Sequence, residues 1–206
     1  MKVDLIIENA AQLITCTSGR RPKRGPEMCN VGLIERGALT INEGKITKVG
    51  ANKEIRRQFQ AKKTIDASGK AVIPGFVDCH THIVFAGNRL DEFELRIKGA
   101  NYLELLASGG GINSTVEKTR NATSNELTKQ SQQRLDEMLR NGTTTAEVKT
   151  GYGLDTITEF KMLNAIAELD QSHVVDLIPT FLAAHAVPNS KFQIPNFRFK
   201  IPKSCG

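Results

Sequence analysis

The stretch Val72-Ile-Pro-Gly-Phe-Val-Asp-Cys-His-Thr-His82 decides the fold. Its β-branched and aromatic residues, together with Pro74 and Gly75, predict a short buried strand. Side chains alternate between the two faces of a strand, so His80 and His82 are expected to point the same way. Two imidazoles at the carboxyl end of a strand can bind one divalent metal ion, as they do in zinc sites. The stretch therefore predicts half of a catalytic metal site.

The neighbourhood of this histidine pair strengthens the prediction. A His-x-His pair alone is a weak signal, because such pairs also occur as structural or surface residues. Here Asp78 precedes the pair, and strand-then-helix patterns recur downstream, as expected for a barrel strand that carries ligands at its functional end. We expect the thiol of Cys79 to be reduced, buried and inert.

Beyond residue 71, strands and helices are expected to alternate. Strands are predicted at 143–149 and 174–182. Helices are predicted to begin at two capping boxes, Ser114 to Glu117 and Thr123 to Glu126, the second helix running to Arg140. A further helix is expected at 156–169, with one apolar face formed by Ile157, Phe160, Leu163 and Ile166.

This alternation predicts an α/β fold with a parallel sheet covered by helices. About three βα units fit into residues 71–188, whereas a (β/α)8 TIM barrel needs eight. The pattern therefore fits either a small open sheet or part of a barrel.

The first 67 or so residues predict a small β-rich unit. Strands are expected at 3–8, 12–17 and 64–66, with a hairpin at 38–50 and a short helix at 53–60. Residues 18–36 are rich in Gly, Pro, Arg and Lys and are predicted to form a loop.

The net charge of +6 does not indicate nucleic-acid binding. Four of these charges belong to residues 189–206, which contain no Asp or Glu. The basic residues are not interleaved with stacking aromatics on a recognisable binding module, so no nucleic-acid partner is expected.

The apolar runs and the cysteines predict the cellular compartment of the protein. No apolar run approaches the roughly 18 residues of a membrane span, and no charged-then-apolar leader precedes Val3. The four cysteines form no CxxC pair and no regular spacing, so no disulfide framework is indicated. We expect a cytoplasmic protein without a membrane partner.

Three residues beyond the histidine pair are candidates for binding. Arg89 follows His82 by seven positions, in a loop where it could hold a substrate carboxylate bidentately; alternatively it is a solvated arginine paired with Asp91 or Glu92. Tyr152, between two glycines, is predicted to be displayed on a tight loop at a strand end.

The third candidate, His185, follows an apolar strand. It could be a metal ligand, a general base or a hydrogen-bond donor to substrate. His173 precedes the same strand and is interpreted as structural. Between these strands, Glu147 and Lys149 would need partners if their strand is buried on both faces.

Several segments together resemble the imidazolonepropionase family of metal-dependent amidohydrolases. They are PGFVDCHTH (74–82), FAGNR (85–89), GGGINSTV (109–116), NGTTTAEVKTGYGL (141–154) and FLAAHAVP (181–188). The resemblance covers about residues 1–188. TTTAEVKTGYGL is specific to this family, whereas PGFVDxHTH indicates only the superfamily.

The resemblance implies a (β/α)8 barrel with a small β-sandwich domain built from both chain ends, and a bound zinc or iron ion. Residues 1–70 would belong to the composite β-sandwich and 71–188 to the first βα units. His80 and His82 match the metal-binding pair, and Arg89, Tyr152 and His185 match positions that contact substrate. Metal-activated water would open the ring of 4-imidazolone-5-propionate to N-formimino-L-glutamate.

The chain also departs from the family. The family has a further metal-binding His, a catalytic Glu and an Asp on later barrel strands, so no catalytic residue is assigned here. Residues 189–206 do not follow the family, and we expect a truncated form. The alternatives are a non-catalytic remnant that associates with another chain, and an amidohydrolase acting on a different cyclic amide or base. The chain could form a homo-oligomer in each of these cases.

Overall fold

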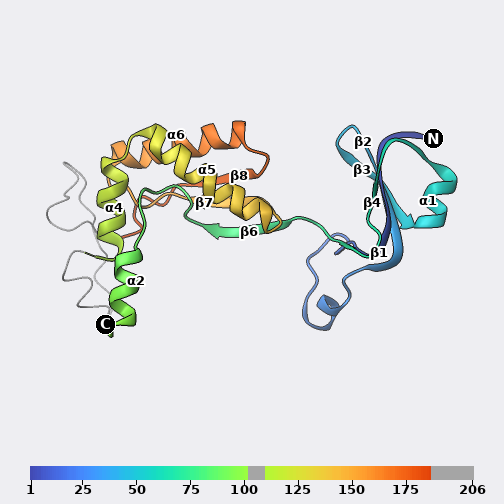
Figure 1. Cartoon of the computed structure of the whole chain (residues 1–206), viewed down its shortest axis with the longest axis horizontal. Helices are drawn as coiled ribbons and strands as arrows, with labels where there is room; N and C mark the ends of the chain where they lie inside the picture. Colours follow the sequence, from blue (N-terminus) through green and yellow to red (C-terminus); the bar gives the residue numbers. More distant parts are fainter. Residues whose placement is uncertain (102–109, 187–206) are drawn as a thin grey trace. The chain divides into compact units, whose positions relative to one another are not determined.

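The computed structural model describes residues 1–101 and 110–186. The chain divides into two compact units, Met1–Pro74 and the part from Gly75 onward (Figure 1). Each unit has its own buried core. The basic tail expected at 189–206 lies outside the described residues.

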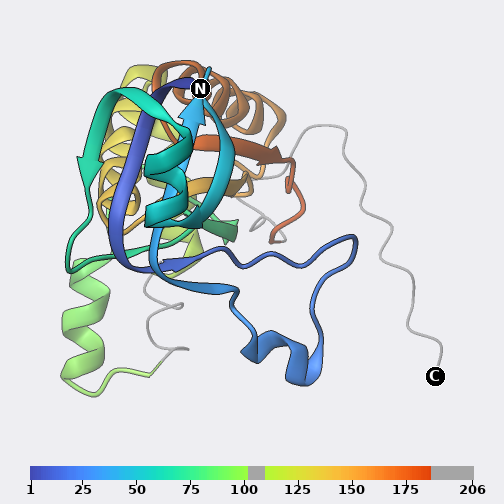
Figure 2. The same ribbon diagram turned by 90° about the vertical axis from the view of Figure 1, so that its right-hand side faces the viewer.

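The first unit is a five-stranded sheet in which β1 is central. The order is β3-β2-β1-β4, and β5 also pairs with β1. Strand β1 runs antiparallel to β2 and parallel to β4 and β5. A short helix, α1, packs against β2 and β3 (Figure 2). The bounds are β1 (Lys2–Ile14), β2 (Leu33–Asn42), β3 (Lys45–Ala51), α1 (Asn52–Gln58), β4 (Gln60–Asp66) and β5 (Ala71–Val72).

Strand β1 corrects the prediction of two strands at 3–8 and 12–17. The chain stays extended throughout, with a register shift against β2 between Ile7 and Ala10. Asn9 takes a left-handed φ of 59° there, and its side chain donates to Asp66 Oδ1 at 3.0 Å. The predicted break is therefore a bulge, which keeps both halves of β1 in one sheet.

The predicted loop at 18–36 is shorter than expected. It contains a 3-10 helix, η1 (Gly25–Cys29), and ends where β2 begins at Leu33. Residues 33–35 are extended because they pair with the last residues of β1, Leu33 with Ile14 and Glu35 with Gln12.

The second unit confirms the α/β prediction. Its three strands lie in the order β6-β7-β8, and all pairs are parallel. Helices α2, α4 and α5 lie between β6 and β7 in the chain, and α6 lies between β7 and β8. The bounds are β6 (Phe76–Thr81), α2 (Leu90–Ile97), α4 (Ile112–Asn121), α5 (Ser124–Arg140), β7 (Thr143–Lys149), α6 (Thr156–Ser172) and β8 (Asp176–Thr180).

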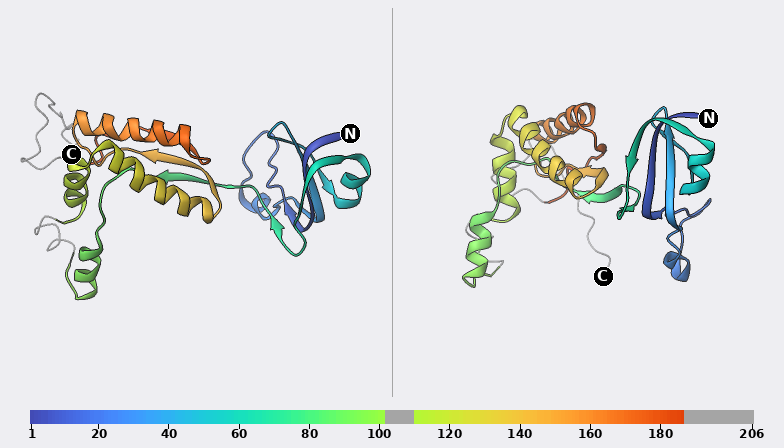
Figure 3. Two further views of the ribbon diagram at one scale, coloured as in Figure 1. Left: turned by 45° about the horizontal axis from the view of Figure 1, so that its top comes forward. Right: turned by 45° about the vertical axis from the view of Figure 1, so that its right-hand side comes forward.

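Helices α5 and α6 lie side by side against the sheet and close its core (Figure 3). Ala146 and Val148 of β7 and Leu177 of β8 face this core and are almost fully buried. The alternate residues of β7, including Glu147 and Lys149, are only partly buried. The sheet is therefore covered by helices on one face.

The predicted apolar face of α6 is largely wrong. Ile157 and Phe160 are 84% and 56% exposed, and of the four predicted residues only Ile166 is fully buried. The buried face is shifted by about one position toward the helix start, so that Glu159 and Met162 replace Phe160 and Leu163; its members are Thr158, Glu159, Met162, Ala165, Ile166 and Leu169. A polar group, the carboxylate of Glu159, takes a place in the core that the apolar pattern assigned to Phe160.

One of the two predicted capping boxes exists. Thr123 caps α5: its hydroxyl accepts from the Glu126 N–H and the Glu126 side chain accepts from the Thr123 N–H. Helix α4 instead begins at Ile112 with Gly111 at its N-cap, so Ser114 lies inside the first turn. The N–H of Gly111 donates to Glu92 Oε1 at 2.9 Å, which fixes the earlier start.

Strand β6 is less buried than expected. Phe76 and Val77 are 54% and 68% exposed, and Cys79 is an exposed free thiol, so its predicted burial is wrong. Within the described residues β6 has one neighbour, β7, so its side chains are covered from one side only. None of the helices in these residues is both long enough and apolar enough to span a bilayer.

Candidate metal and substrate site

The candidate site lies at the carboxyl ends of the three parallel strands. His82 follows β6 directly, Tyr152 follows the end of β7, and His185 follows β8. Parallel strands present their carboxyl ends at the same edge of a sheet, which is where α/β folds place ligands. The structure thus brings together three of the residues singled out in the sequence.

An irregularity in β6 shapes this end of the sheet. Asp78 pairs with Ala146 and Thr81 with Val148, so β6 uses one more residue than β7 over the same span. The extra residue forms a bulge, a common device for aiming side chains near active sites. The N–H of His80 donates to Asp78 Oδ1 at 3.1 Å within it.

His82 is the centre of a cluster of rings. Its ring centroid lies 5.7 Å from that of His80, 5.1 Å from Tyr152 and 4.6 Å from His185. Both of its ring nitrogens are buried without a hydrogen-bond partner in the described part of the chain. A buried imidazole normally satisfies its nitrogens, so these unpaired atoms fit a metal ligand.

The pKa of His82 is lowered from its ordinary value of 6.5. Burial is the main cause, followed by repulsion from His185 and His80, whereas the backbone of Thr150 acts in the opposite direction. A lowered pKa keeps the ring neutral near pH 7, and only the neutral ring can donate an electron pair to a metal.

The loop that carries Tyr152 is pressed against His185. Gly151 has a φ of +114°, and a Cβ added there would lie 2.6 Å from Cβ of His185. Only glycine suits this position, because both the backbone conformation and the close approach exclude a side chain. The ring centroids of Tyr152 and His185 are consequently 5.7 Å apart.

A pocket of about 370 Å³ adjoins the ring cluster. Arg89, Arg134 and Tyr152 supply its charged and phenolic groups. The remaining lining comes from Phe85, Gly87, Asn88 and Thr115. Two guanidinium groups and a phenol favour a small ligand that carries a carboxylate.

The structure shows the ion pair that the sequence analysis gave as the alternative for Arg89. Its Nε donates to Glu92 Oε2 at 3.1 Å. The same side chain lines the pocket and is 39% exposed. Glu92 therefore orients Arg89 without removing it from the pocket.

Arg134 was not singled out in the sequence. Its guanidinium lies 3.6 Å from the ring centroid of Phe85 and donates to the carbonyl oxygens of Ile83 and Phe85, each at 2.8 Å. Burial lowers the pKa of Arg134. The arginine fixes the segment after β6 in place, and no sequence motif marks it.

Glu147 and Lys149 have the partners that the sequence required. They form an ion pair on β7, and Thr180 Oγ1 donates to Glu147 Oε1 at 2.6 Å. The hydrogen bonds from Lys149 and then Thr180 hold the pKa of Glu147 below its usual range. A negative charge is thus held beside the histidines.

His173 occupies the opposite end of β8. Its Nε2 lies 3.3 Å from Asp136 Oδ1, and its Nδ1 accepts from the N–H of Val175 at 3.1 Å. These contacts tie the end of α6 to α5 and to the residue before β8, in agreement with a structural role.

Comparisons with known proteins agree with this fold. A sequence profile of the Amidohydrolase family matches residues 63–105, which include the histidine pair. Among solved structures, E. coli guanine deaminase superposes with a TM-score of 0.60 at 24% identity, covering 84% of this chain and 36% of that one. A triazine hydrolase variant superposes with a TM-score of 0.56 at 17% identity, covering 86% of this chain and 35% of that one. The profile and the shared fold make the chain similar to the amidohydrolases.

Among curated proteins the chain is similar to imidazolonepropionases. It is 53% identical to the one from Chloroflexus aggregans over 185 residues, which is 90% of this chain and 43% of that protein. It is 49% identical to the imidazolonepropionase from Herpetosiphon aurantiacus, over 90% of this chain and 43% of that protein. For the one from Alkaliphilus metalliredigens the identity is 47%, over 91% of this chain and 45% of that protein. The resemblance stated from the motifs is confirmed, and the chain spans less than half the length of these curated relatives.

Proposed function

We propose that this chain carries the metal-binding pair and the substrate pocket of an imidazolonepropionase-type hydrolase. The reaction would open the ring of 4-imidazolone-5-propionate to N-formimino-L-glutamate. The observation that carries the proposal is the arginine-lined pocket beside His82, in a chain up to 53% identical to imidazolonepropionases. In this proposal residues 1–70 contribute to a composite β-sandwich and 71–188 form the first units of a barrel.

His80 and His82 are the proposed ligands of a zinc or iron ion. The unpaired nitrogens of His82 support this assignment. Bound there, such an ion would supply a water molecule acidified toward neutral pH and a positive charge that polarises the ring carbonyl. Two histidines are fewer than the three protein ligands of a typical catalytic zinc site, so the proposal assigns further ligands to other parts of a complete family member.

The remaining site residues bind and orient the substrate. Arg89 would hold the propionate carboxylate, because a guanidinium pairs with a carboxylate through two hydrogen bonds. Tyr152 and His185, next to His82, would donate hydrogen bonds to the imidazolone ring. Within the described residues, Cys16, Cys29 and Cys79 form no disulfide, which supports a reducing compartment such as the cytoplasm.

Binding of 4-imidazolone-5-propionate tests this proposal. Calorimetry on the purified chain with zinc is expected to show binding, with guanine and dihydropyrimidine binding more weakly. Arg89→Gln should weaken binding by about 10- to 100-fold, the value of a hydrogen bond to a charged group. Arg96→Gln, at an exposed position of α2, the helix that begins directly after Arg89, is the matched control and should leave binding unchanged. Preference for guanine or dihydropyrimidine, or equal effects of the two variants, would contradict the proposal.

A further inference from the structure

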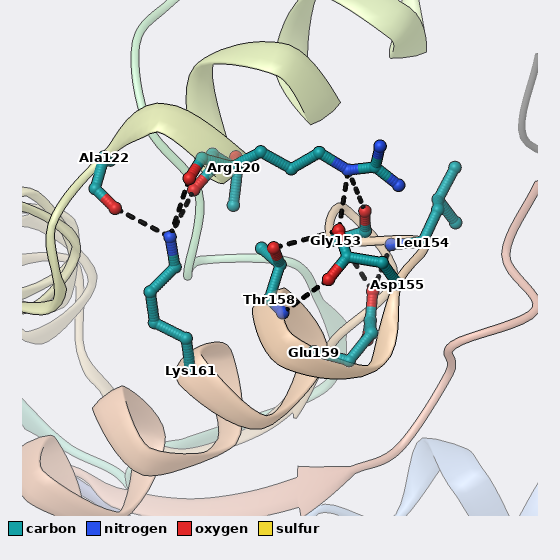
Figure 4. A network of polar contacts seen from close by, with 9 residues as sticks. Arg120, Ala122, Gly153, Leu154, Asp155, Thr158, Glu159 and Lys161 are labelled. Carbon is teal, nitrogen blue, oxygen red and sulfur yellow. Dashed lines mark hydrogen bonds and ion pairs between the residues drawn. The ribbon is translucent and has the colours of Figure 1, made fainter. Parts of the chain in front are cut away.

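The loop that carries Tyr152 is held by a carboxylate from the core. Glu159 lies in the first turns of α6 and is completely buried. Its Oε2 accepts from the N–H of Gly151 at 3.0 Å, and its Oε1 accepts from the N–H groups of Gly153 and Leu154 at 2.8 and 2.9 Å. The three bonded amides lie on both sides of Tyr152 in the chain, and Figure 4 shows Gly153 and Leu154 next to Glu159.

This arrangement uses both carboxylate oxygens as acceptors. Three backbone donors converge on one anion, and the nearby start of α6 adds the favourable field of a helix N-terminus. The glycines allow the approach: a Cβ added at Gly153 would lie 2.9 Å from Glu159 Oε1. A glutamine could not replace the glutamate, because its NH₂ group would face at least one backbone N–H.

Arg120 holds the same loop, and Lys161 links α6 to the end of α4. Arg120 Nε donates to the carbonyl oxygen of Gly153 at 2.7 Å and pairs with Asp155 Oδ2 at 2.8 Å. Lys161 Nζ donates to three carbonyl oxygens at the end of α4, those of Thr119, Arg120 and Ala122, at 2.7–3.0 Å (Figure 4). The loop is thereby fixed to α6 by Glu159 and to α4 by Arg120.

The position of the loop matters at the site. Tyr152 lines the pocket, and its ring lies 5.1 Å from His82 and 5.7 Å from His185, centroid to centroid. Without the three hydrogen bonds to Glu159, the glycines on either side would let the loop adopt other conformations. Tyr152 would then leave the ring cluster.

We propose that Glu159 is the positioning residue of the substrate site, because its buried carboxylate fixes the backbone on both sides of Tyr152. Only the link from Tyr152 to substrate rests on the proposed function. The positioning itself concerns the metal-free, ligand-free chain.

Tyrosine fluorescence tests the positioning directly. The sequence has two tyrosines, Tyr102 and Tyr152, and no tryptophan, so Tyr102→Phe leaves Tyr152 as the single fluorophore. In this background, Glu159→Gln should raise the acrylamide quenching constant by about twofold or more, because the phenol leaves its packed position. Glu168→Gln makes the same chemical change on the exposed side of α6 and should have no effect. Equal quenching in Glu159→Gln and its parent, with far-ultraviolet circular dichroism intact, would overturn the proposal.

A measurement on the unmodified chain covers the case in which Glu159→Gln does not fold. Amide hydrogen exchange, followed by nuclear magnetic resonance, should show Gly151, Gly153 and Leu154 protected although they lie in a loop. Exchange as fast as in an open loop would contradict the proposal.

Substrate binding separates this inference from the proposed function. If Tyr152 is released in Glu159→Gln and the parent also binds 4-imidazolone-5-propionate, the variant should bind it roughly tenfold more weakly, since preorganisation is lost. If the parent binds none, the proposed function fails, while the quenching result still decides whether Glu159 positions Tyr152.

Discussion

His82 shows how single residues define this site. Its ring is packed among Tyr152 and two other histidines, yet neither nitrogen has a partner in the described residues that meets the geometry of a normal hydrogen bond, and the Thr150 backbone contributes only a weak interaction. Packing without hydrogen bonding is costly for a purely structural histidine. The arrangement is stabilising only if something binds the nitrogens.

The lowered pKa of His82 predicts how the stability of the metal-free chain depends on pH. Its folded-state pKa lies below the ordinary value of 6.5, so below that pH the unfolded chain takes up a proton that the folded chain resists. The free energy of unfolding should therefore be fully retained above about pH 6.5 and fall as the pH drops toward the folded-state pKa. Urea titrations from pH 8 to 5 would measure this fall. His82→Gln should make it shallower, and a stability that rises toward acid would contradict the sign.

Gly151 gives a second prediction at this scale. Gly151→Ala should lower the free energy of unfolding by about 1–3 kcal/mol, because it adds backbone strain and a collision with His185. Gly99→Ala is the matched control: its φ is +97°, but nothing lies within 4 Å of an added Cβ. The fall in the free energy of unfolding of Gly99→Ala should therefore reflect the backbone strain alone. Equal losses in urea titrations would mean that the contact with His185 is unimportant.

Sequence reasoning singled out residues where a residue type and its place at a strand end sufficed. The histidines and Tyr152 were singled out in this way, and the structure places His82, Tyr152 and His185 close together. Glu159 was missed, although it falls in register with Met162, Ile166 and Leu169 on the buried face. A charged residue at an apolar position was the available signal. Arg134 had none, because its partners are carbonyl oxygens of Ile83 and Phe85, which no side-chain pattern reveals.

Among the elements, helix α5 illustrates how far local sequence decides a boundary. Its N-cap, Thr123, was predicted from a capping box and is confirmed. The similar box at Ser114 does not begin α4, because Gly111 is held by Glu92 from another helix. Local motifs therefore predict a helix start only where no tertiary contact competes.

These two boxes provide a matched test. Thr123→Ala should lower the free energy of unfolding by about 1 kcal/mol, because it removes the hydroxyl that accepts from the Glu126 N–H. Ser114→Ala, inside the first turn of α4, should change it by less than about 0.5 kcal/mol. Thermal unfolding followed by circular dichroism would measure both. A larger loss for Ser114→Ala would show that the box at 114 acts as a cap.

The sequence could not predict which face of α6 is exposed or that β6 contains a bulge, and the reason is the same in both cases. The apolar pattern of α6 fits two faces shifted by one residue, and Ile166 belongs to both. The packing against α5 and β8 selects the face that buries Glu159. Likewise the register of β6 depends on its pairing with β7. Patterns within one element do not encode such pairings.

For the molecule as a whole, the second unit exposes more apolar surface than a finished α/β domain would. Within the described residues, β6 and β8 each have one neighbouring strand. Ile178 and Phe181 are 55% and 57% exposed near one edge, and the Phe181 ring lies 6.4 Å from that of Phe160. Open edges and apolar patches of this kind bind other surfaces. The curated relatives, more than twice as long, have additional chain that could cover them.

Self-association of the isolated chain should follow from this surface. Sedimentation velocity is expected to show concentration-dependent association, and Ile178→Lys should reduce it by placing a charge beside the edge strand. Ile157→Lys adds the same charge at an exposed position of α6 and should reduce it less. A monomeric parent chain, or equal effects of the two variants, would refute the prediction.

The side chains that contact Glu147 hold one end of the three-stranded sheet more firmly than the other. Thr81 Oγ1 donates to the Glu147 carbonyl oxygen at 2.6 Å, and Thr180 Oγ1 donates to its carboxylate at 2.6 Å, so one residue of β7 fastens both neighbouring strands. These ties lie toward the carboxyl ends, beside the histidines. Opening of the sheet should therefore begin at the amino ends of the strands, and the histidine end should be the last part of the sheet to lose its shape.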